Sequence, residues 1–168
     1  MDLMQLSEFY EYKNQLMEDL LTNAEIVRLL CDGNAPEDVK SLVYTQVFPF
    51  EYIPETLEHG ATYICCDVDI QRVDSRTYLT PSIQIWLFSH KSKLRLPEGG
   101  VRTDRLSAEI AETINGSRNY GLGELELYSV RRFAPIPDYQ GKVMTFRAKE
   151  INRLGPNTMP IPERRGNR

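Results

Sequence analysis

The fold is decided by residues 62–90, TYICCDVDIQRVDSRTYLTPSIQIWLFSH, two alternating segments joined by a short polar turn. In 62–73, every second residue from Ile64 to Ile70 is apolar or cysteine, and the positions between them are mixed. In 80–90, both sets of alternate positions carry bulky side chains. Alternation is typical of β-strands because successive side chains point to opposite faces. The stretch therefore predicts an antiparallel hairpin whose second strand is central and covered on both faces.

The N-terminal segment, 1–45, predicts helices rather than strands. Apolar residues recur near helical spacing over 9–21. The pattern Thr22-x-x-Glu25 predicts a capping box that starts a second helix. A third, short helix is expected over 36–44, because proline and acidic residues favour a first helical turn.

The C-terminal half predicts one more helix and a second hairpin. Thr103 is expected to cap a helix over 103–114, and strands are expected over 123–133 and 142–151, joined by a turn at 138–141. The order helices-β-β-α-β-β predicts an α+β fold: a four-stranded antiparallel sheet with helices packed on it.

Length and composition favour one domain. The chain has 168 residues, 41% of them hydrophobic and 26% charged. We divide it into an N-terminal helical segment (1–45), an α/β core (46–151) belonging to the same domain, and a flexible basic C-terminal arm (152–168). The segment 47–60 contains two prolines and is expected to be extended against the domain or a neighbour.

Charge and apolar patterning exclude several classes of protein. A net charge of −4 argues against a general nucleic-acid binder and against docking on an anionic membrane. We expect no membrane span, because no apolar run is long enough, and no secretory signal at the acidic N-terminus. An odd number of cysteines, two of them adjacent, predicts a reducing compartment rather than a disulfide framework.

Two carboxylates, Asp67 and Asp69, are predicted to share a strand face. With Glu124 or Glu126 they would form an oxygen-ligand site for a hard cation, as a metal-dependent nuclease or hydrolase requires. The alternatives are a solvated sheet face, or carboxylates that pair with arginines across a subunit contact. We favour these alternatives, because two carboxylates at this spacing are a weak signal.

The other reactive residue types show no catalytic spacing. His59 and His90 are expected at loop or strand-end positions without metal or general-base partners. Cys65 and Cys66 are adjacent in a predicted strand, so their sulfurs should point to opposite faces and pack there. The sequence therefore predicts a protein that is not an enzyme, with no catalytic residue, no metal and no cofactor.

Aromatic and basic residues outside the predicted core are candidates for contacts with other proteins. They come from the proline-containing segment, the bulky strand, the loop after that strand and the arginine-rich tail. The candidate interface residues are Phe48, Phe50, Tyr52, Trp86, Lys91, Lys93, Arg95, Arg164 and Arg165.

Several phrases of the sequence resemble neck and tail-completion proteins of tailed bacteriophages, and most of all the tail terminator class. They are VFPFEYIPET, TYICCDVDI, PSIQIWLFSHK, VRTDRLSAEIAETINGSRNYGLGELEL and DYQGKVMTFRAKEIN, and the resemblance covers residues 22–152. It implies a structural virion protein, assembled in the bacterial host cytoplasm, that forms a homohexameric ring at the head-proximal end of the tail tube.

Such a ring ends tube polymerisation and joins the tail to the head connector. The resemblance thus implies three partners: copies of the same chain, the tail tube protein and the neck proteins of the head connector. DNA would touch the ring only transiently, while passing through its lumen. A head-completion or adaptor protein of the neck is the alternative assembly role, and a nuclease or hydrolase using Asp67 and Asp69 is the alternative from another class.

Overall fold

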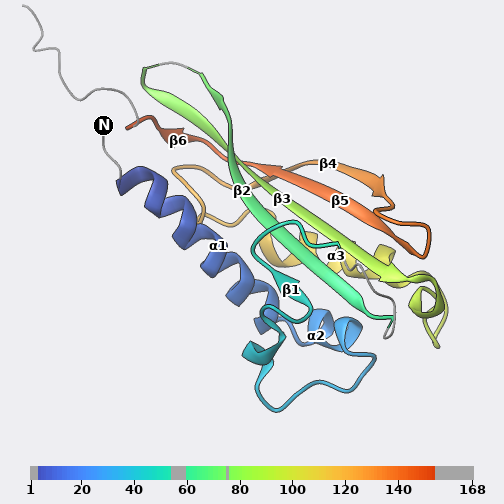
Figure 1. Ribbon diagram of the computed structural model, residues 1–168. Helices are drawn as coiled ribbons and strands as arrows, with labels where there is room; N and C mark the ends of the chain where they lie inside the picture. The colour runs from blue at the N-terminus through green and yellow to red at the C-terminus, as the bar shows by residue number, and fades with distance from the viewer. Residues whose placement is uncertain (1–3, 54–59, 75, 154–168) are drawn as a thin grey trace, which may run out of the picture.

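The computed structural model describes residues 4–53, 60–74 and 76–153. It is a mixed α+β structure with an open sheet and helices packed on one of its faces (Figure 1). The helices on that face are α1 (Met4–Thr22), α2 (Ala24–Leu30) and α3 (Arg102–Ile114). Two 3-10 turns, η1 (Val39–Leu42) and η2 (Lys91–Lys93), lie in the connections.

In the described part of the chain the sheet has six strands, so the prediction of four is wrong. Their order is β1-β2-β3-β5-β4, and β6 pairs with the N-terminal end of β3. The strands are β1 (Val47–Phe48), β2 (Thr62–Val73), β3 (Tyr78–His90), β4 (Glu126–Phe133), β5 (Tyr139–Arg147) and β6 (Glu150–Ile151).

The two additional strands are too short to show periodicity. β1 pairs with β2 in parallel, with Val47 opposite Ile64, and Pro49 follows it. Proline has no N–H to donate to a ladder, so β1 does not continue. β6 pairs with Tyr78 and Leu79 at the start of β3. The four longer strands pair with one another in antiparallel fashion, as predicted.

The central position of β3 is confirmed, but its coverage on both faces is not. Ile83, Ile85 and Leu87 are buried beneath the helices. On the other face, Gln84 and Trp86 are only half-buried. The chain therefore covers one face of its sheet with helices and leaves part of the other, hereafter the open face, accessible to solvent.

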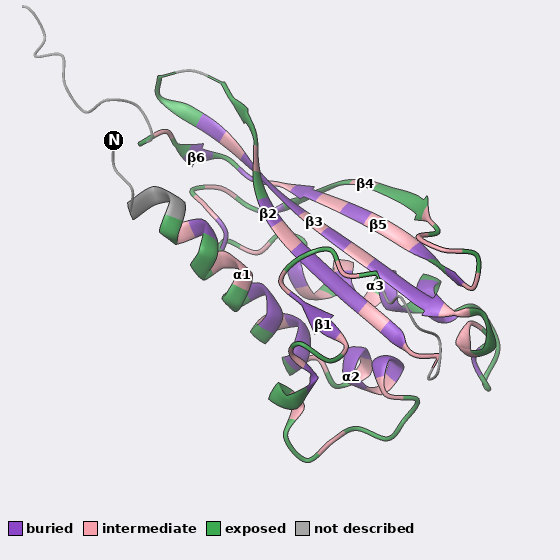
Figure 2. Ribbon diagram, viewed as in Figure 1, coloured by how far each residue is buried: buried purple, intermediate pink, exposed green. Residues whose placement is uncertain are grey.

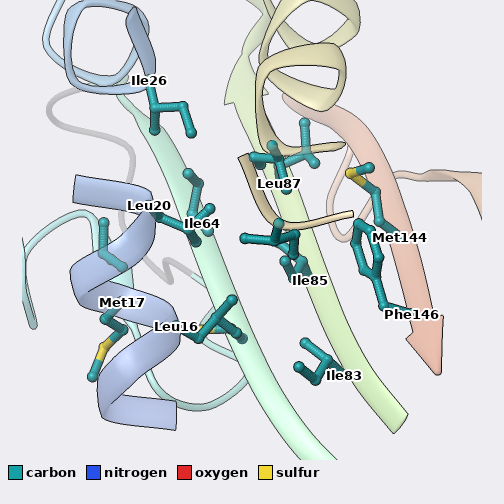
Figure 3. Close-up of a cluster of buried hydrophobic side chains, with 14 of the residues drawn as sticks. Leu16, Met17, Leu20, Ile26, Ile64, Ile83, Ile85, Leu87, Met144 and Phe146 are labelled. Atoms are coloured by element: carbon teal, nitrogen blue, oxygen red, sulfur yellow. The ribbon is translucent and has the colours of Figure 1, made fainter. Parts of the chain in front are cut away.

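The main core lies between the helices and the sheet (Figures 2 and 3). Leu16 and Leu20 of α1 and Ile26 of α2 are fully buried, and in Figure 3 they lie beside Ile64 of β2. Met144 and Phe146 alternate with half-buried residues along β5, as their spacing predicts. Fully burying an aliphatic side chain of this size stabilises a fold by about 1.5–3 kcal/mol.

The second helix begins one residue later than the capping-box pattern predicts. Thr22 ends α1, and Asn23 caps α2. The Asn23 side-chain oxygen accepts from the N–H groups of Glu25 (2.9 Å) and Ile26 (3.3 Å). Asparagine is an equal or better cap than threonine, so it takes this position. The expected third helix is reduced to the 3-10 turn η1.

The start of α3 also differs from prediction, because a buried arginine determines it. Helix α3 begins at Arg102, after a Val101 cap with no side-chain hydrogen bond, and Thr103 lies inside the helix. The Arg102 guanidinium forms an ion pair with Asp32 and donates to the carbonyl oxygens of Leu29 and Lys93. These bonds join the end of α2 to the start of α3 and outweigh a threonine cap.

The connection predicted at 138–141 is shorter than expected, because the turn ends at Asp138 and the other three residues belong to a strand. β5 starts at Tyr139, whose ring is fully buried and meets the Phe88 ring edge-on at 5.8 Å between centroids. Gly141 lies opposite Phe88. A Cβ at position 141 would lie only 1.8 Å from the Leu87 carbonyl oxygen, so only glycine permits this close strand contact.

Candidate assembly surfaces

One end of the open face carries a second hydrophobic cluster, hereafter the aromatic cluster. It is separate from the main core and draws on β1, β2, β3, β4, β5 and the segments after β1 and β4. Its members are Phe48, Tyr52, Tyr63, Cys65, Trp86, Phe88, Phe133, Ile136 and Tyr139.

The proline-containing segment after β1 folds onto this end of the open face. The Tyr52 ring stacks on Phe48 at 4.2 Å between centroids, and the Cys65 thiol donates to the Tyr52 carbonyl oxygen at 3.6 Å. Phe50 extends outward and is 45% exposed. Of the segment 47–60, expected to be extended, Val47 and Phe48 form a strand, Pro49 and Phe50 form a bend, and Tyr52 beyond the bend packs in the aromatic cluster. Residues 54–59 lie outside the described part of the chain.

The aromatic cluster is only partly shielded by its own chain. Phe48, Phe88 and Tyr139 are buried, but Tyr52, Tyr63, Trp86, Phe133 and Ile136 are partly exposed. A tilted Tyr63–Phe88 pair, 5.5 Å between centroids, continues the ring contacts across β2 and β3. Rings that are half-buried in a single chain supply the rigid apolar area typical of the centre of protein interfaces.

A basic loop, 91–95, follows β3 at this end of the sheet, and its first residue borders the aromatic cluster. Lys91 follows His90, the last residue of β3, and its ammonium pairs with Asp138 at 2.5 Å. This hydrogen bond holds the pKa of the Asp138 carboxyl below its ordinary value. Lys93 pairs with Asp32, also at 2.5 Å, and Arg95 is exposed.

The structure therefore gathers most of the candidate interface residues at one end of the sheet. Phe48 is buried within the aromatic cluster, Tyr52 and Trp86 are half-buried there, and Phe50 and Lys91 flank it. Lys93 and Arg95 lie at the same end of the sheet, beside α2 and the start of α3. The end of the sheet so defined, hereafter the aromatic–basic end, comprises Phe50, Tyr52, Trp86, Lys91, Lys93 and Arg95. Arg164 and Arg165 lie outside the described residues.

Asp67 and Asp69 of β2 do not form a cation site with Glu124 or Glu126. Asp67 forms an ion pair with Lys13 of α1. Glu126 lies on β4, with β3 and β5 between it and β2, and Glu124 pairs with Arg118 at 2.8 Å. Within 4–53, 60–74 and 76–153, no group of three or more histidine, cysteine or acidic side chains is placed to hold a metal ion.

Asp69 is the less well compensated of these two carboxylates. Its pKa is raised, first by burial and then by the neighbouring Asp67 carboxylate, while the Lys13 ammonium opposes the increase. One ammonium thus faces two carboxylates at the edge of β2. This edge of β2 therefore carries more negative than positive charge.

The described histidine, His90, caps a turn, and Cys65 and Cys66 pack among hydrophobic side chains. His90 caps η2, with its Nδ1 atom 2.7 Å from the Ser92 hydroxyl, and His59 lies outside the described residues. Cys65 and Cys66 pack on opposite faces, as predicted. Burial raises the pKa of the Cys65 thiol to about 11 and raises that of Cys66 as well. High thiol pKa values suppress the thiolate that nucleophilic or redox chemistry needs.

A second surface, at the outer strand β4, was missed by the sequence analysis. Leu127, Tyr128 and Val130 are 37%, 58% and 43% exposed, and Arg131 and Arg132 are exposed as well. Helix α3 packs against β3 and β5, so β4 extends past the helical layer, and Figure 2 shows it largely green. The signal in the sequence was the absence of clean alternation in LYSVRRF, which is typical of an edge strand exposed on both faces.

These surfaces define a class of protein: an α+β domain with a sheet covered by helices on one face, and with apolar and charged surfaces left at one end and along one edge. The chain belongs to the YomW family, whose sequence model matches residues 23–148. The family carries the name of a gene from a Bacillus phage region, which indicates a phage-related protein. No curated protein matches the chain. None of the helices in the described residues combines the length and apolar character that a membrane span requires.

Proposed function

We propose that this protein is a tail terminator of a tailed phage, a virion protein that forms a homohexameric ring on the head-proximal end of the tail tube. In this role it ends tube polymerisation and joins the tail to the head connector. It is assembled in the bacterial host cytoplasm and remains in the neck of the virion. Membership of a phage-related family and the sequence phrases over 22–152 support this assignment.

The observation that carries the proposal is the aromatic–basic end of the sheet. It combines half-buried rings, Tyr52 and Trp86, with a border of lysines and arginine. Protein interfaces commonly have this arrangement, an aromatic centre surrounded by polar residues. Because this surface lies where the strands end, it suits contact with the next protein along the tail axis, and we assign that partner as the tail tube protein.

The overall charge is consistent with a conduit for DNA. The chain carries a net charge of −4, and a ring of copies multiplies this charge. Like charge keeps a polyanion from adhering to the wall of a channel. The protein therefore needs no affinity for DNA in this role.

A tube-length assay tests the proposal. Purified tail tube protein is polymerised with and without this protein, and tube lengths are measured by negative-stain microscopy. We expect tubes to become shorter and their length distribution narrower as the protein is added. The double variant Phe50→Ser/Tyr52→Ser should lose this effect. Leu122→Ser, which alters an exposed apolar side chain next to Lys149 at the opposite end of the sheet, should keep it.

Two results would contradict the proposal. Tubes that grow to the same length at every ratio of the two proteins would show that the chain does not stop polymerisation. Copies seated against the portal instead of the tube end in a particle image would favour the head-completion or adaptor role.

A further inference from the structure

We propose that copies of this chain join through their sheet edges: β4 of one copy pairs, antiparallel, with residues 66–73 of β2 in the next. The inference rests on the proposed ring, and it names the surface that builds the ring and its occupant, a second copy of this chain. The two edges lie on opposite sides of the sheet: β4 ends the strand order on one side, and on the other β2 forms the edge beyond the two-residue strand β1 (Figure 1).

The acceptor edge is the part of β2 that β1 leaves unpaired. β1 pairs only with Ile64 and Cys65, so in the described part of the chain residues 66–73 border no strand on that side. The N–H of Val68 instead donates to the Asp67 carboxylate at 2.8 Å. A side-chain oxygen here takes the place that a carbonyl oxygen of a neighbouring strand would fill.

The donor edge is β4, which has eight residues and spans a length close to that of the free part of β2. It pairs with β5 on one side and borders no described strand on the other. Its exposed side chains include Leu127 and Val130. The Leu127 N–H donates to the Asn115 side-chain oxygen at 2.8 Å, so the edge offered to another chain lies beyond Leu127.

Strand direction and side-chain parity agree with this pairing. Directions alternate across β2, β3, β5 and β4, so a β2 strand placed next to β4 in a continued sheet runs antiparallel to it. The strand register puts Arg131 on the open face, the same face as Asp67 and Asp69. In a continued sheet, cations of one copy therefore meet carboxylates of the next on one face.

The opposite face of the same contact is apolar. Val130 and Leu127 lie opposite Met144 and Phe146 in the strand register, which places them on the helical side of the sheet. In their own copy none of the described helices covers them sufficiently to bury them.

A groove beside β2 offers the matching cover. It lies between α1 and β2, has a volume of about 330 Å³, and is lined by Phe9, Tyr10, Lys13, Val68, Asp69 and Ile70. In a continued sheet, α1 of the next copy lies just beyond β4, so its exposed Tyr10 would cover Val130. The helical layer would then continue from copy to copy.

The charge deficit at β2 is corrected by the same contact. Among the described residues of one chain, Lys13 is the cation that faces Asp67 and Asp69. Arg131 of a neighbour adds the second cation, and a guanidinium can bind a carboxylate with two parallel hydrogen bonds. An interface between two different edges is heterologous, and such an interface closes into a ring when the rotation per copy permits.

Charge reversal tests the pairing on the full chain. Arg131→Asp and Asp69→Arg should each shift the ring to monomers in native mass spectrometry, with at least a tenfold weaker self-association. The double variant Asp69→Arg/Arg131→Asp carries both reversed edges in every copy, so it should form rings again. Arg105→Asp, on the outer side of α3, is the matched control and should leave the ring intact.

Cross-linking identifies the neighbouring residues directly. The pair Asp69→Cys/Arg131→Cys in a Cys31→Ser background should give an oxidised ladder of multimers, whereas each single cysteine variant should stay monomeric on a denaturing gel. Circular dichroism establishes that each variant is folded. Rings that persist in both single charge reversals and give no ladder would overturn this inference alone, while a wild-type chain that never assembles would overturn the proposed function itself.

Discussion

Replacing Trp86 by alanine separates what this ring does for the fold from what it does for assembly. Burying an aromatic side chain of 150–250 Å² at about 25 cal/mol per Å² stabilises by about 4–6 kcal/mol. Trp86 is half-buried in the single chain, so about 2–3 kcal/mol of this is realised on folding. The remainder becomes available only when a partner covers the aromatic–basic end.

Urea denaturation and tube binding measure these two parts. Trp86→Ala should lower the free energy of unfolding by about 2–3 kcal/mol and weaken attachment to tail tubes at least tenfold. Phe88→Ala is the reference, because Phe88 is fully buried and its loss should cost about 3–5 kcal/mol. The reasoning is refuted if Trp86→Ala costs as much as Phe88→Ala, or if it leaves tube attachment unchanged.

Three further changes probe the fold and its ionisation. Arg102→Ala should lower the free energy of unfolding by about 3 kcal/mol, the lower end for a broken buried ion pair because Asp32 is a third exposed, and urea denaturation measures it. Gly141→Ala should cost at least about 1–3 kcal/mol, because its Cβ meets the Leu87 carbonyl oxygen; a stability equal to wild type in the same assay would contradict this. Burial raises the pKa of Tyr63 from 10.0 to about 12, so the stability it contributes is complete below pH 10 and is lost as the pH rises toward 12. Tyr63→Phe should therefore lose less stability than wild type across that interval in urea titrations, and equal losses would exclude Tyr63 as a source.

The hairpin and the central strand were predictable because their signal is repeated many times. Ile64, Cys66 and Val68 occupy one face of β2, and the same alternation recurs along β3 and β5. Each additional repeat of the alternation strengthens the prediction of a strand. Helix α3 was equally clear, since its buried residues are spaced along one face.

The remaining differences come from contacts that are distant in sequence. β1 has only two residues, so it is recognised as a strand by its pairing with Ile64 and Cys65 and not by its own sequence. Tyr139 belongs to a strand because Phe88 and Tyr63 hold its ring, although the surrounding residues resemble a turn. Arg102 sets the start of α3 through Asp32, which lies far back in the chain.

The candidate surfaces were found in part for the same reason. Aromatic composition identified Phe50, Tyr52 and Trp86, but only the fold shows that they share one end of the sheet with Lys91. The sequence of β4 contains no recognisable motif, because a strand exposed on both faces lacks a regular alternation of apolar and polar residues. Surfaces made for other copies or partners become visible once the strand order is known.

Imaging of tail tubes capped by the purified protein is the decisive measurement. Tubes assembled in vitro are incubated with the protein, and their ends are averaged by cryo-electron microscopy. A closed ring of copies stacked on one end of the tube, with an open lumen and with the aromatic–basic end turned toward the last tube ring, is the predicted result. Bare tube ends in the presence of excess folded protein would contradict it.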